Sequence, residues 1–301
     1  MIKLKNVLYT YALGTPFEKT ALTGLNIEIK EGEFIAVAGR TGSGKSTLIQ
    51  LISGLITPTS GVVSVDEVDL QSRNKLEALM ARRKVGIVFQ YPEEQLFEQT
   101  VEADVGFAPI NLGCSAEEVS ERVKASLDRV GLDYDKYRLK EPHNLSGGQK
   151  RRVAIAGVLA MNPKYLILDE PTAGLDPKAR RELMQMTKKL HSGGVTVIMV
   201  SHNMDEIAGF AKRLIVLSKG KLIVDATPRE VFANAEILTA AGLKKPTAAQ
   251  VLTELKTAGV DIDTNVLTID EAEEQIRNAA RHNAGAVLPW KVSSTQIRPA
   301  C

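Results

Sequence analysis

Four runs of mainly hydrophobic residues interrupt the polar sequence, at positions 34–38, 85–89, 165–168 and 195–200. They are continuous rather than alternating, which is typical of parallel strands that are covered on both faces of a sheet. Helical patterns separate the runs. After the first run, hydrophobic residues recur at helical spacing at Leu48, Leu51, Ile52 and Leu55. The alternation of strands and helices predicts an α/β fold with a parallel sheet.

A distinctive polar element follows each run directly. Residues 39–46 read Gly-Arg-Thr-Gly-Ser-Gly-Lys-Ser, and the other three runs are followed by Gln90, by Asp169-Glu170 and by Ser201-His202. In open α/β sheets, ligands bind outside the carboxyl ends of the strands. We therefore expect all four elements to line one edge of the sheet and to converge on one ligand.

Helices are predicted for most of the chain from about residue 96 to 160, inserted between the second and third strands. Their clearest patterns cover residues 120–130 and 146–160. Further along, residues 214–224 favour a β-hairpin. Residues 227–230, Thr-Pro-Arg-Glu, have the pattern of a capping box with proline at the first helical position.

A smaller module is predicted from about residue 235 to 283, after a main domain of residues 1–234. It contains two helices, the second starting with a capping box at residues 268–271. Their hydrophobic stripes are expected at Val251, Leu255 and Ala258, and at Ala272, Ile276 and Ala279. These stripes are too small for an independent core of good size, so we expect them to pack against a partner. Residues 284–301 have no acidic residue and no hydrophobic period, which predicts a loosely attached tail or a segment added during cloning.

Composition narrows the class of protein. The 301 residues allow one large or two modest domains, and 38 Lys and Arg against 36 Asp and Glu leave a charge of +2, which gives no electrostatic reason to expect a nucleic-acid partner. Cys114 and Cys301 lack metal-ligand spacing and indicate a reducing, cytosolic compartment. The first residues lack the apolar stretch of a signal peptide, and the hydrophobic runs are too short to cross a membrane, so any membrane role would come through a partner.

Residues 39–46 have the pattern of a phosphate-binding loop. Glycines let the backbone curl so that its N–H groups face phosphate oxygens, and the following helix offers its N-terminus to negative charge. We expect Lys45 to reach the β- and γ-phosphates and the Ser46 hydroxyl to bind Mg²⁺. A chance glycine turn does not explain the strand before and the helix after. The expected nucleotide-binding residues here are Gly39, Thr41, Gly42, Ser43, Gly44, Lys45, Ser46 and Thr47.

Residues 145–149, Leu-Ser-Gly-Gly-Gln, resemble the signature motif of ABC ATPases. Ser146, Gly147 and Gly148 would open a helix whose free N–H groups and positive dipole end suit a γ-phosphate, with Gln149 beside them. Because the loop at 39–46 already occupies the near side of the nucleotide, the resemblance implies that this helix end is supplied by the opposite monomer. The alternative is a plain Ser-Gly-Gly helix cap.

The strand at 165–168 and the acidic pair after it match a Walker B element. Asp169 can hold Mg²⁺, directly or through water, and Glu170 would activate the attacking water as general base. An acidic pair after a strand can also be only a solvated loop start. The position of this pair at the same sheet edge as Lys45 favours the functional role.

Further residues take roles from the same resemblance. Gln90 resembles the Q-loop residue that touches Mg²⁺ or water, and His202 the switch histidine that contacts the γ-phosphate. Asp176, in Ala-Gly-Leu-Asp-Pro, resembles the D-loop residue at the dimer interface, although it could equally start a helix. Tyr11 looks like the aromatic residue that stacks on adenine, a contact worth roughly 1–3 kcal/mol, with Tyr9 as its rival.

These motifs occur in the family's order, so the chain from residue 1 to about 283 is identified as a member of the ABC ATPases, with a P-loop NTPase fold. Residues 90–97, Gln-Tyr-Pro-Glu-Glu-Gln-Leu-Phe, resemble the ATPases of energy-coupling factor transporters, which take up vitamins and transition-metal ions in prokaryotes. Residues 14–18 and the C-terminal module resemble the second of the two paired ATPases. Residues 104–109 depart slightly from the family pattern.

The resemblance implies ATP and Mg²⁺ as ligands, ATP hydrolysis, and a peripheral position on the cytoplasmic face of the cell membrane. It also implies a second ABC ATPase, most simply as a heterodimer, a transmembrane coupling protein, and indirectly a substrate-binding membrane protein. Acidic Glu93 and Glu94, with Glu98 nearby, suit docking of basic coupling helices, or form a solvated helix start. The C-terminal module is expected to hold the two ATPases together.

Three other functions fit parts of the sequence. A conventional ABC importer ATPase would share the nucleotide motifs. A soluble ABC ATPase acting on DNA or ribosomes is disfavoured by the near-neutral charge, the one nucleotide module and the lack of a long heptad insertion. A non-catalytic ABC module is disfavoured because Glu170, His202 and the signature residues are all present.

Overall fold

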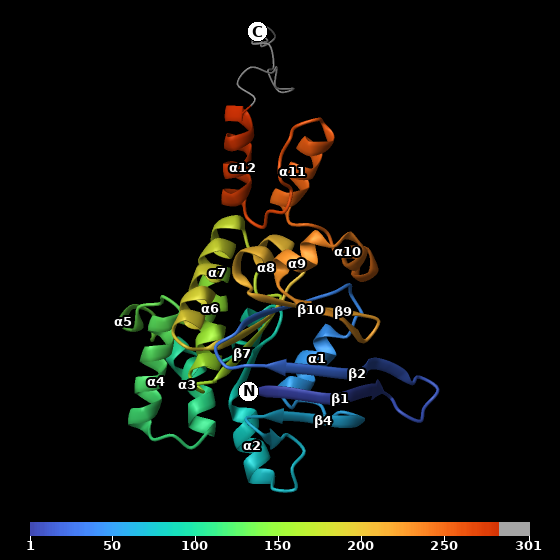
Figure 1. Cartoon of the computed structure of the whole chain (residues 1–301). Helices are drawn as coiled ribbons and strands as arrows, with labels where there is room; N and C mark the ends of the chain where they lie inside the picture. The colour runs from blue at the N-terminus through green and yellow to red at the C-terminus, as the bar shows by residue number, and fades with distance from the viewer. Residues whose placement is uncertain (283–301) are drawn as a thin grey trace.

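The computed structural model describes residues 1–282 as two sheets with helices packed around them (Figure 1). In chain order the elements are β1 (Ile2–Tyr11), β2 (Lys19–Ile29), β3 (Phe34–Ala38), α1 (Lys45–Ile52), β4 (Ser60–Val65), β5 (Val68–Asp69), α2 (Lys75–Arg83), β6 (Val85–Val88), η1 (Pro92–Gln95), α3 (Val101–Asn111), α4 (Ala116–Arg129), α5 (Tyr134–Tyr137), η2 (Pro142–Asn144), α6 (Gly147–Leu159), β7 (Tyr165–Asp169), α7 (Pro177–Ser192), β8 (Thr196–Val200), α8 (Met204–Phe210), β9 (Arg213–Ser218), β10 (Lys221–Ala226), α9 (Pro228–Ala233), α10 (Ala235–Ala241), α11 (Thr247–Thr257) and α12 (Ile269–His282).

The central sheet has six strands in the order β10-β9-β3-β8-β7-β6. Neighbours from β9 to β6 pair in parallel, and β10 closes one edge as the antiparallel arm of the predicted hairpin. The four strands expected from the hydrophobic runs are β3, β6, β7 and β8, so the predicted α/β fold with a parallel sheet is confirmed. Val200 pairs with both Val37 and Asp169, which places the carboxyl ends of β3, β7 and β8 level with one another.

A second, antiparallel sheet in the order β2-β1-β4-β5 was not anticipated from the sequence. Its buried side chains share one core with α1 and with one face of the central sheet. In Figure 1 these strands lie below the central sheet, on the side opposite α4 and α5. The sheet places Tyr11, at the end of β1, near the start of α1.

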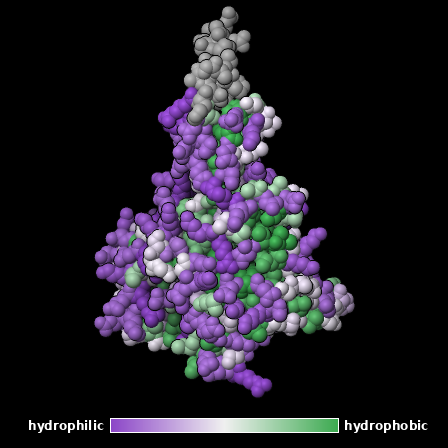
Figure 2. Space-filling model, in the orientation of Figure 1, coloured by the Kyte–Doolittle hydropathy of each residue, from purple (hydrophilic) through white to green (hydrophobic). Residues whose placement is uncertain are grey.

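The helical insertion covers the other face of the central sheet. α3, α4 and α6 bury Val105, Val123, Leu127, Val153 and Ile155 in a core that also contains side chains of β3, β7 and β8. This arrangement agrees with the helices predicted for residues 96–160. Figure 2 shows hydrophilic residues over this part of the surface, whereas hydrophobic residues gather below the C-terminal helices.

The C-terminal helices differ from the sequence prediction in two respects. α10 follows the predicted boundary at residue 235, but its Leu238 and Ala241 belong to the larger core, and a separate small cluster begins only at Ala248. On α11 Leu255 of the predicted stripe packs against this cluster, whereas Val251 is 44% exposed and Leu252 is buried instead. The tail predicted at 284–301 lies outside the described residues.

Two other features of this region agree with the sequence. Thr227 and Glu230 form the predicted capping box at the start of α9. Ala272 and Ala279 of α12 are buried, with Ile276 packed against them, as predicted for that stripe. Within residues 1–282 no helix combines the length and the apolar composition that crossing a membrane requires.

Candidate functional site

The loop at residues 39–46 connects β3 to α1, and its backbone conformation requires glycine at two positions. Gly39 has φ of 149°, and a Cβ there would lie 2.2 Å from the carbonyl oxygen of Leu217. Gly44 has φ of 106°, and a Cβ there would lie 2.5 Å from the Leu22 side chain. Gly42, with φ of 79°, has open space on its side-chain side. Neighbouring atoms therefore pack closely against the backbone at Gly39 and Gly44, whereas the space beside Gly42 is open and a ligand can approach the backbone there.

Polar groups inside the loop fit a phosphate. The buried Lys45 ammonium donates to the carbonyls of Gly39 at 2.7 Å and Arg40 at 3.2 Å, so it lies across the loop. Burial lowers the pKa of Lys45, while the charges of Glu170 and Asp169 oppose that effect. The Ser43 hydroxyl is buried and has no hydrogen-bond partner in the part of the chain that the structure describes. An unpaired buried hydroxyl beside a lysine and a ring of amides is a donor set that an anion satisfies.

Glu170 and His202 face each other across the ends of β7 and β8. The Glu170 N–H donates to Val200 O at 2.9 Å, and the His202 N–H donates to Glu170 Oε2 at 3.3 Å. His202 Nε2 lies 3.3 Å from Glu170 Oε1. Since Val200 also pairs with the end of β3, these contacts bring both side chains to the edge that carries Lys45.

The electrostatics of this edge suit proton transfer near neutral pH. Burial raises the pKa of Glu170 to about 7, and the charge of Asp169 adds to this, although the His202 N–H and the Lys45 charge oppose it. Burial likewise raises the pKa of Asp169, and burial together with Lys45 lowers the pKa of His202. A carboxyl with a pKa close to the working pH is well suited to accept a proton from water.

Three oxygen donors are available for Mg²⁺. Within residues 1–282, the Ser46 hydroxyl, the Gln90 side-chain amide and the Asp169 carboxylate make no hydrogen bond. Ser46 lies in the first turn of α1, Gln90 lies two residues after β6, and Asp169 is the last residue of β7. Hydroxyl, amide and carboxylate oxygens are ligands that Mg²⁺ accepts, so these residues fit the ion. The described residues contain no cluster of three or more His, Cys, Asp or Glu side chains, so the remaining positions around the ion would fall to phosphate oxygens and water.

Tyr11 supplies an aromatic face next to the loop. Its hydroxyl lies 3.0 Å from the Thr47 hydroxyl, and the residue is 40% exposed. Tyr9 meets the Tyr11 ring edge to face at 4.8 Å and packs against the core. Of the two candidates, Tyr11 is therefore the one with a ring surface free for a base.

The signature residues begin α6 as a helix cap. The Gln149 N–H donates to Ser146 Oγ at 3.3 Å and the Ser146 N–H donates to Gln149 Oε1 at 3.1 Å, a reciprocal capping box that was not predicted. Gln149 Nε2 also donates to the Tyr137 hydroxyl. Ser146, Gly147 and Gly148 line a cavity of about 460 Å³, whereas Gly39, Glu170 and His202 line a different cavity of about 600 Å³.

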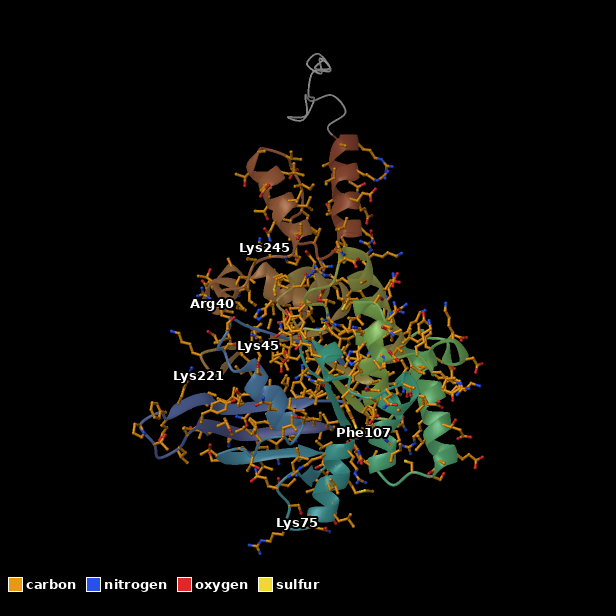
Figure 3. The ribbon with its side chains drawn as sticks, turned by 180° about the vertical axis from the view of Figure 1, so that it is seen from behind. Arg40, Lys45, Lys75, Phe107, Lys221 and Lys245 are labelled. Carbon is orange, nitrogen blue, oxygen red and sulfur yellow. The ribbon has the colours of Figure 1, made fainter. Side chains whose placement is uncertain are left out.

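The structure therefore does not bring the signature residues together with the phosphate loop. Figure 3 shows Lys45 at the start of α1, with Arg40 and Lys245 between it and the C-terminal helices. The two halves of the expected site therefore line separate cavities within one chain. This is the arrangement that the resemblance to ABC ATPases implied.

Asp176 lies in the cavity of the signature residues and caps α7. Its carboxylate accepts hydrogen bonds from the N–H groups of Lys178 at 2.8 Å and Ala179 at 3.0 Å. Those bonds lower the pKa of Asp176. The helix-start role considered from the sequence is thus present, and contact with a nucleotide remains a prediction.

Arg151 is a site residue that the sequence prediction missed. It is 1% exposed, and its guanidinium pairs with both oxygens of Glu93 at 2.6 and 2.9 Å. It also donates to the carbonyls of Pro171 and Ala173, directly after Glu170. Its signal was its spacing, because it precedes the buried residues Ile155 and Leu159 by four and eight positions on α6.

The ion pair with Arg151 corrects the role expected for Glu93. Its carboxylate is engaged inside the molecule, so it is not a free acidic group for a basic coupling helix. Glu94 is exposed and remains available.

Comparisons with known proteins agree with this geometry. The ABC transporter family profile matches residues 22–173. The energy-coupling factor transporter ATP-binding protein EcfA2 of Clostridium perfringens is 50% identical over 283 residues, covering 94% of this chain and 99% of that protein. The EcfA2 protein of Streptococcus pyogenes is 47% identical over 278 residues, covering 92% and 99%.

Solved structures show the same fold. CbiO1 from Clostridium perfringens, described as part of the ABC transporter complex cbiONQ, has a TM-score of 0.70 at 39% identity and covers 79% of this chain and 92% of its own. The ATP-binding cassette MJ0796, as a dimer bound to ADP and Pi, has a TM-score of 0.66 at 36% identity and covers 76% and 99%. The chain therefore belongs to the ABC transporter ATPase family, in which relatives that match it over nearly their whole length are the ATP-binding proteins of energy-coupling factor transporters.

Proposed function

We propose that this chain is the ATP-binding and ATP-hydrolysing subunit of an energy-coupling factor transporter. The observation that carries the proposal is the convergence of Lys45, Asp169, Glu170 and His202 at three level strand ends, since this set can bind a triphosphate and activate water. The sequence identity of 50% to an energy-coupling factor transporter ATP-binding protein, over 94% of this chain, supports this transporter class over a conventional importer.

ATP binding is assigned to the edge between Tyr11 and the phosphate loop. The exposed Tyr11 ring stacks on adenine, and the loop amides with Ser43 hold the phosphate oxygens. Lys45 supplies the counter-charge for the β- and γ-phosphates. Thr47 holds the Tyr11 hydroxyl and thereby fixes the ring beside the loop.

Hydrolysis is assigned to Glu170 and His202. Glu170, with its raised pKa, accepts the proton of the attacking water, and His202 contacts the γ-phosphate. Ser46, Asp169 and Gln90 are proposed to hold Mg²⁺, which when bound neutralises charge that develops on the phosphate oxygens.

A complete site is proposed to need a second ABC ATPase. Ser146, Gly147, Gly148 and Gln149 of one chain would face the phosphate loop of the other, which is consistent with the separate cavities they line here. Asp176 lines the same cavity as the signature residues and would lie at the interface between the chains. Known dimers of the related MJ0796 cassette make such pairing reasonable, and the resemblance to the second of two paired ATPases favours a heterodimer.

Docking on a transmembrane coupling protein is assigned to the surface beside η1 and α3. Phe97, Phe107 and Ile110 are exposed there, and the two phenylalanine rings meet edge to face at 4.9 Å. Exposed Glu94 adds negative charge next to this apolar surface. The subunit would thus be peripheral, at the cytoplasmic face of the membrane, and a separate membrane protein would bind the vitamin or metal ion.

The central test is hydrolysis by the purified complex with Glu170→Gln in this chain. The amide cannot accept a proton, so we expect ATP binding to persist while the hydrolysis rate falls by about two orders of magnitude or more. Hydrolysis at the parental rate would refute the role of Glu170. Purification of the parental chain without any membrane protein, under conditions that preserve complexes, would refute the transporter assignment.

A further inference from the structure

Glu206 is a buried carboxylate that none of the roles above uses. It lies in α8, four residues after His202, and is 5% exposed. The Thr172 hydroxyl donates to Oε1 at 2.7 Å, and the Ser201 hydroxyl donates to Oε2 at 3.1 Å. The Asn203 side-chain amide also donates to Oε1, at 3.3 Å. Because both oxygens accept hydrogen bonds, the ionised carboxylate is satisfied where it lies.

The two hydroxyl donors come from the two segments that carry the proposed catalytic groups. Thr172 lies two residues after Glu170, in the turn that leaves β7, and Ser201 directly precedes His202 after β8. The pairing of β7 with β8 ends at Asp169 and Val200. Beyond these residues, Glu206 connects the two turns. Within residues 1–282, the other bonds between these segments are that of the Glu170 N–H to Val200 O and the contacts between Glu170 and His202.

The turn after β7 has reason to need such support. Glu170 has φ of 48°, the left-handed region, in which a residue with a Cβ is strained. Residues held in this region persist when surrounding contacts over-determine the backbone, and they occur often at functional sites. Here the Ala173 N–H closes the turn on the Glu170 carbonyl at 3.1 Å, and the Thr172 side chain anchors the same turn to Glu206.

We propose that Glu206 is a positioning residue for ATP hydrolysis: through Thr172 and Ser201 it holds the turn after Glu170 and the turn of His202 in a fixed relation, so that both side chains face one γ-phosphate. It acts through these two segments and not by touching the nucleotide. The inference rests on the base role proposed for Glu170.

Two charged side chains lie close to the Glu206 carboxylate. The groups that face Glu206 are Arg180 on α7, whose Nε lies 3.7 Å from Oε1, and Asp205 beside it on α8. Burial raises the pKa of Glu206, whereas the bonds from Thr172 and Ser201 and the Arg180 charge lower it.

The test compares Glu206→Gln with the parental chain in the purified complex, measuring kcat and KM for ATP from pH 5.5 to 9. Glutamine keeps the size, but it replaces one carboxylate oxygen by an NH2 group that cannot accept a hydrogen bond, so it cannot accept from both the Thr172 and the Ser201 hydroxyl. We expect kcat to fall by about 10- to 100-fold, as when a catalytic group is misplaced, with KM changed less than about threefold. Glu121→Gln, an exposed change of equal charge on α4, is the matched control and should match the parental chain.

A second pair of variants keeps the test decisive if Glu206→Gln does not fold. Thr172→Val removes one arm of the bridge and should lower kcat, whereas Thr172→Ser keeps the hydroxyl and should retain the parental rate. Parental kcat in Glu206→Gln or in Thr172→Val would overturn the proposal, as would a change in KM alone. If Glu170→Gln is inactive while Glu206→Gln is unaffected, only this inference fails. If Glu170→Gln itself hydrolyses ATP normally, the base assignment and this inference fall together.

Discussion

Lys45 places a buried ammonium group across the phosphate loop, where it bonds only to the carbonyls of Gly39 and Arg40 within residues 1–282. A triphosphate would offer this group a charged partner in place of two neutral ones. We expect Lys45→Ala to weaken ATP binding by at least about 2 kcal/mol, or ~30-fold in Kd. Calorimetry on the purified chain measures this, with Lys30→Ala, a change of an exposed lysine directly after β2, as the control. Unchanged affinity would remove Lys45 from the site.

The raised pKa of Glu170 predicts a pH dependence of hydrolysis. The carboxyl must be ionised to accept a proton, so kcat should rise with pH and level off above about 7. The same shift means that the folded chain binds more protons than the unfolded one between pH 4.5 and about 7, so its contribution to stability declines as pH rises through that range. Kinetic and unfolding measurements between pH 5 and 9 check both. A flat kcat profile across neutral pH would contradict the assignment.

The sequence predicted some site residues and missed others. The difference is whether a residue's position follows from its sequence neighbours or from partners that are distant in the sequence. Lys45, Glu170 and His202 follow hydrophobic strands directly, so their place at the sheet edge followed from the pattern. Arg151 and Glu206 lie in helices, and turns from other strands bury them. Their partners are far away in sequence, and no local pattern names those partners.

At the scale of elements, η1 and α6 are joined by one ion pair. Arg151 of α6 holds Glu93 of η1 and, on its other side, the backbone after Glu170. Arg151 therefore contacts both η1 and the turn after Glu170.

Glu93 and Glu94 should consequently behave differently when their charge is reversed. Glu94→Lys changes an exposed residue and should weaken co-purification with the membrane partner while leaving the melting temperature and ATP affinity unchanged. Glu93→Lys leaves the buried Arg151 without its carboxylate partner and beside a like charge, which should destabilise the fold by about 3–5 kcal/mol. Thermal unfolding and co-purification of both variants test this. Equal behaviour of the two would contradict the separation of roles.

Strands that are buried on both faces were predicted well. Strands with an interrupted alternation, and the helix α11 with its partly exposed hydrophobic residues, were predicted poorly. The four parallel strands are covered on both faces, so their hydrophobic runs mark them to within a residue. β1 and β2 carry register shifts, which break the alternation that would have revealed them. On α11 the buried side chains are Ala248 and Leu252, which share the small cluster with residues of α12, whereas Val251 remains exposed.

At the scale of the whole molecule, the last two helices stand apart from the catalytic body but are tied to it. Figure 1 shows α11 and α12 side by side beyond α8 and α9. Asp205 of α8 accepts hydrogen bonds from the Thr247 N–H at 2.6 Å and its hydroxyl at 2.7 Å, so it caps α11 in place of a local residue. Since Asp205 lies three residues after His202, the helix pair is joined to the catalytic edge as well as to the core.

The final prediction concerns pairing of two chains through this helix pair. Its core is small, and Val251 and Ile269 leave hydrophobic surface exposed, at 44% and 75%. Burial of these side chains against a second ATPase would contribute roughly 1.5–3 kcal/mol each. The double variant Val251→Glu with Ile269→Glu should therefore weaken nucleotide-free association of the two ATPases. ATP affinity should not change, because both positions lie away from the phosphate loop.

Thr257→Glu, which adds a charge at an exposed polar position of α11, should associate like the parental chain. Analytical ultracentrifugation of the purified ATPases without nucleotide measures the effect. If the double variant associates as tightly as the control, the helix pair does not hold the two ATPases together, and the contacts that join them must lie in the catalytic body.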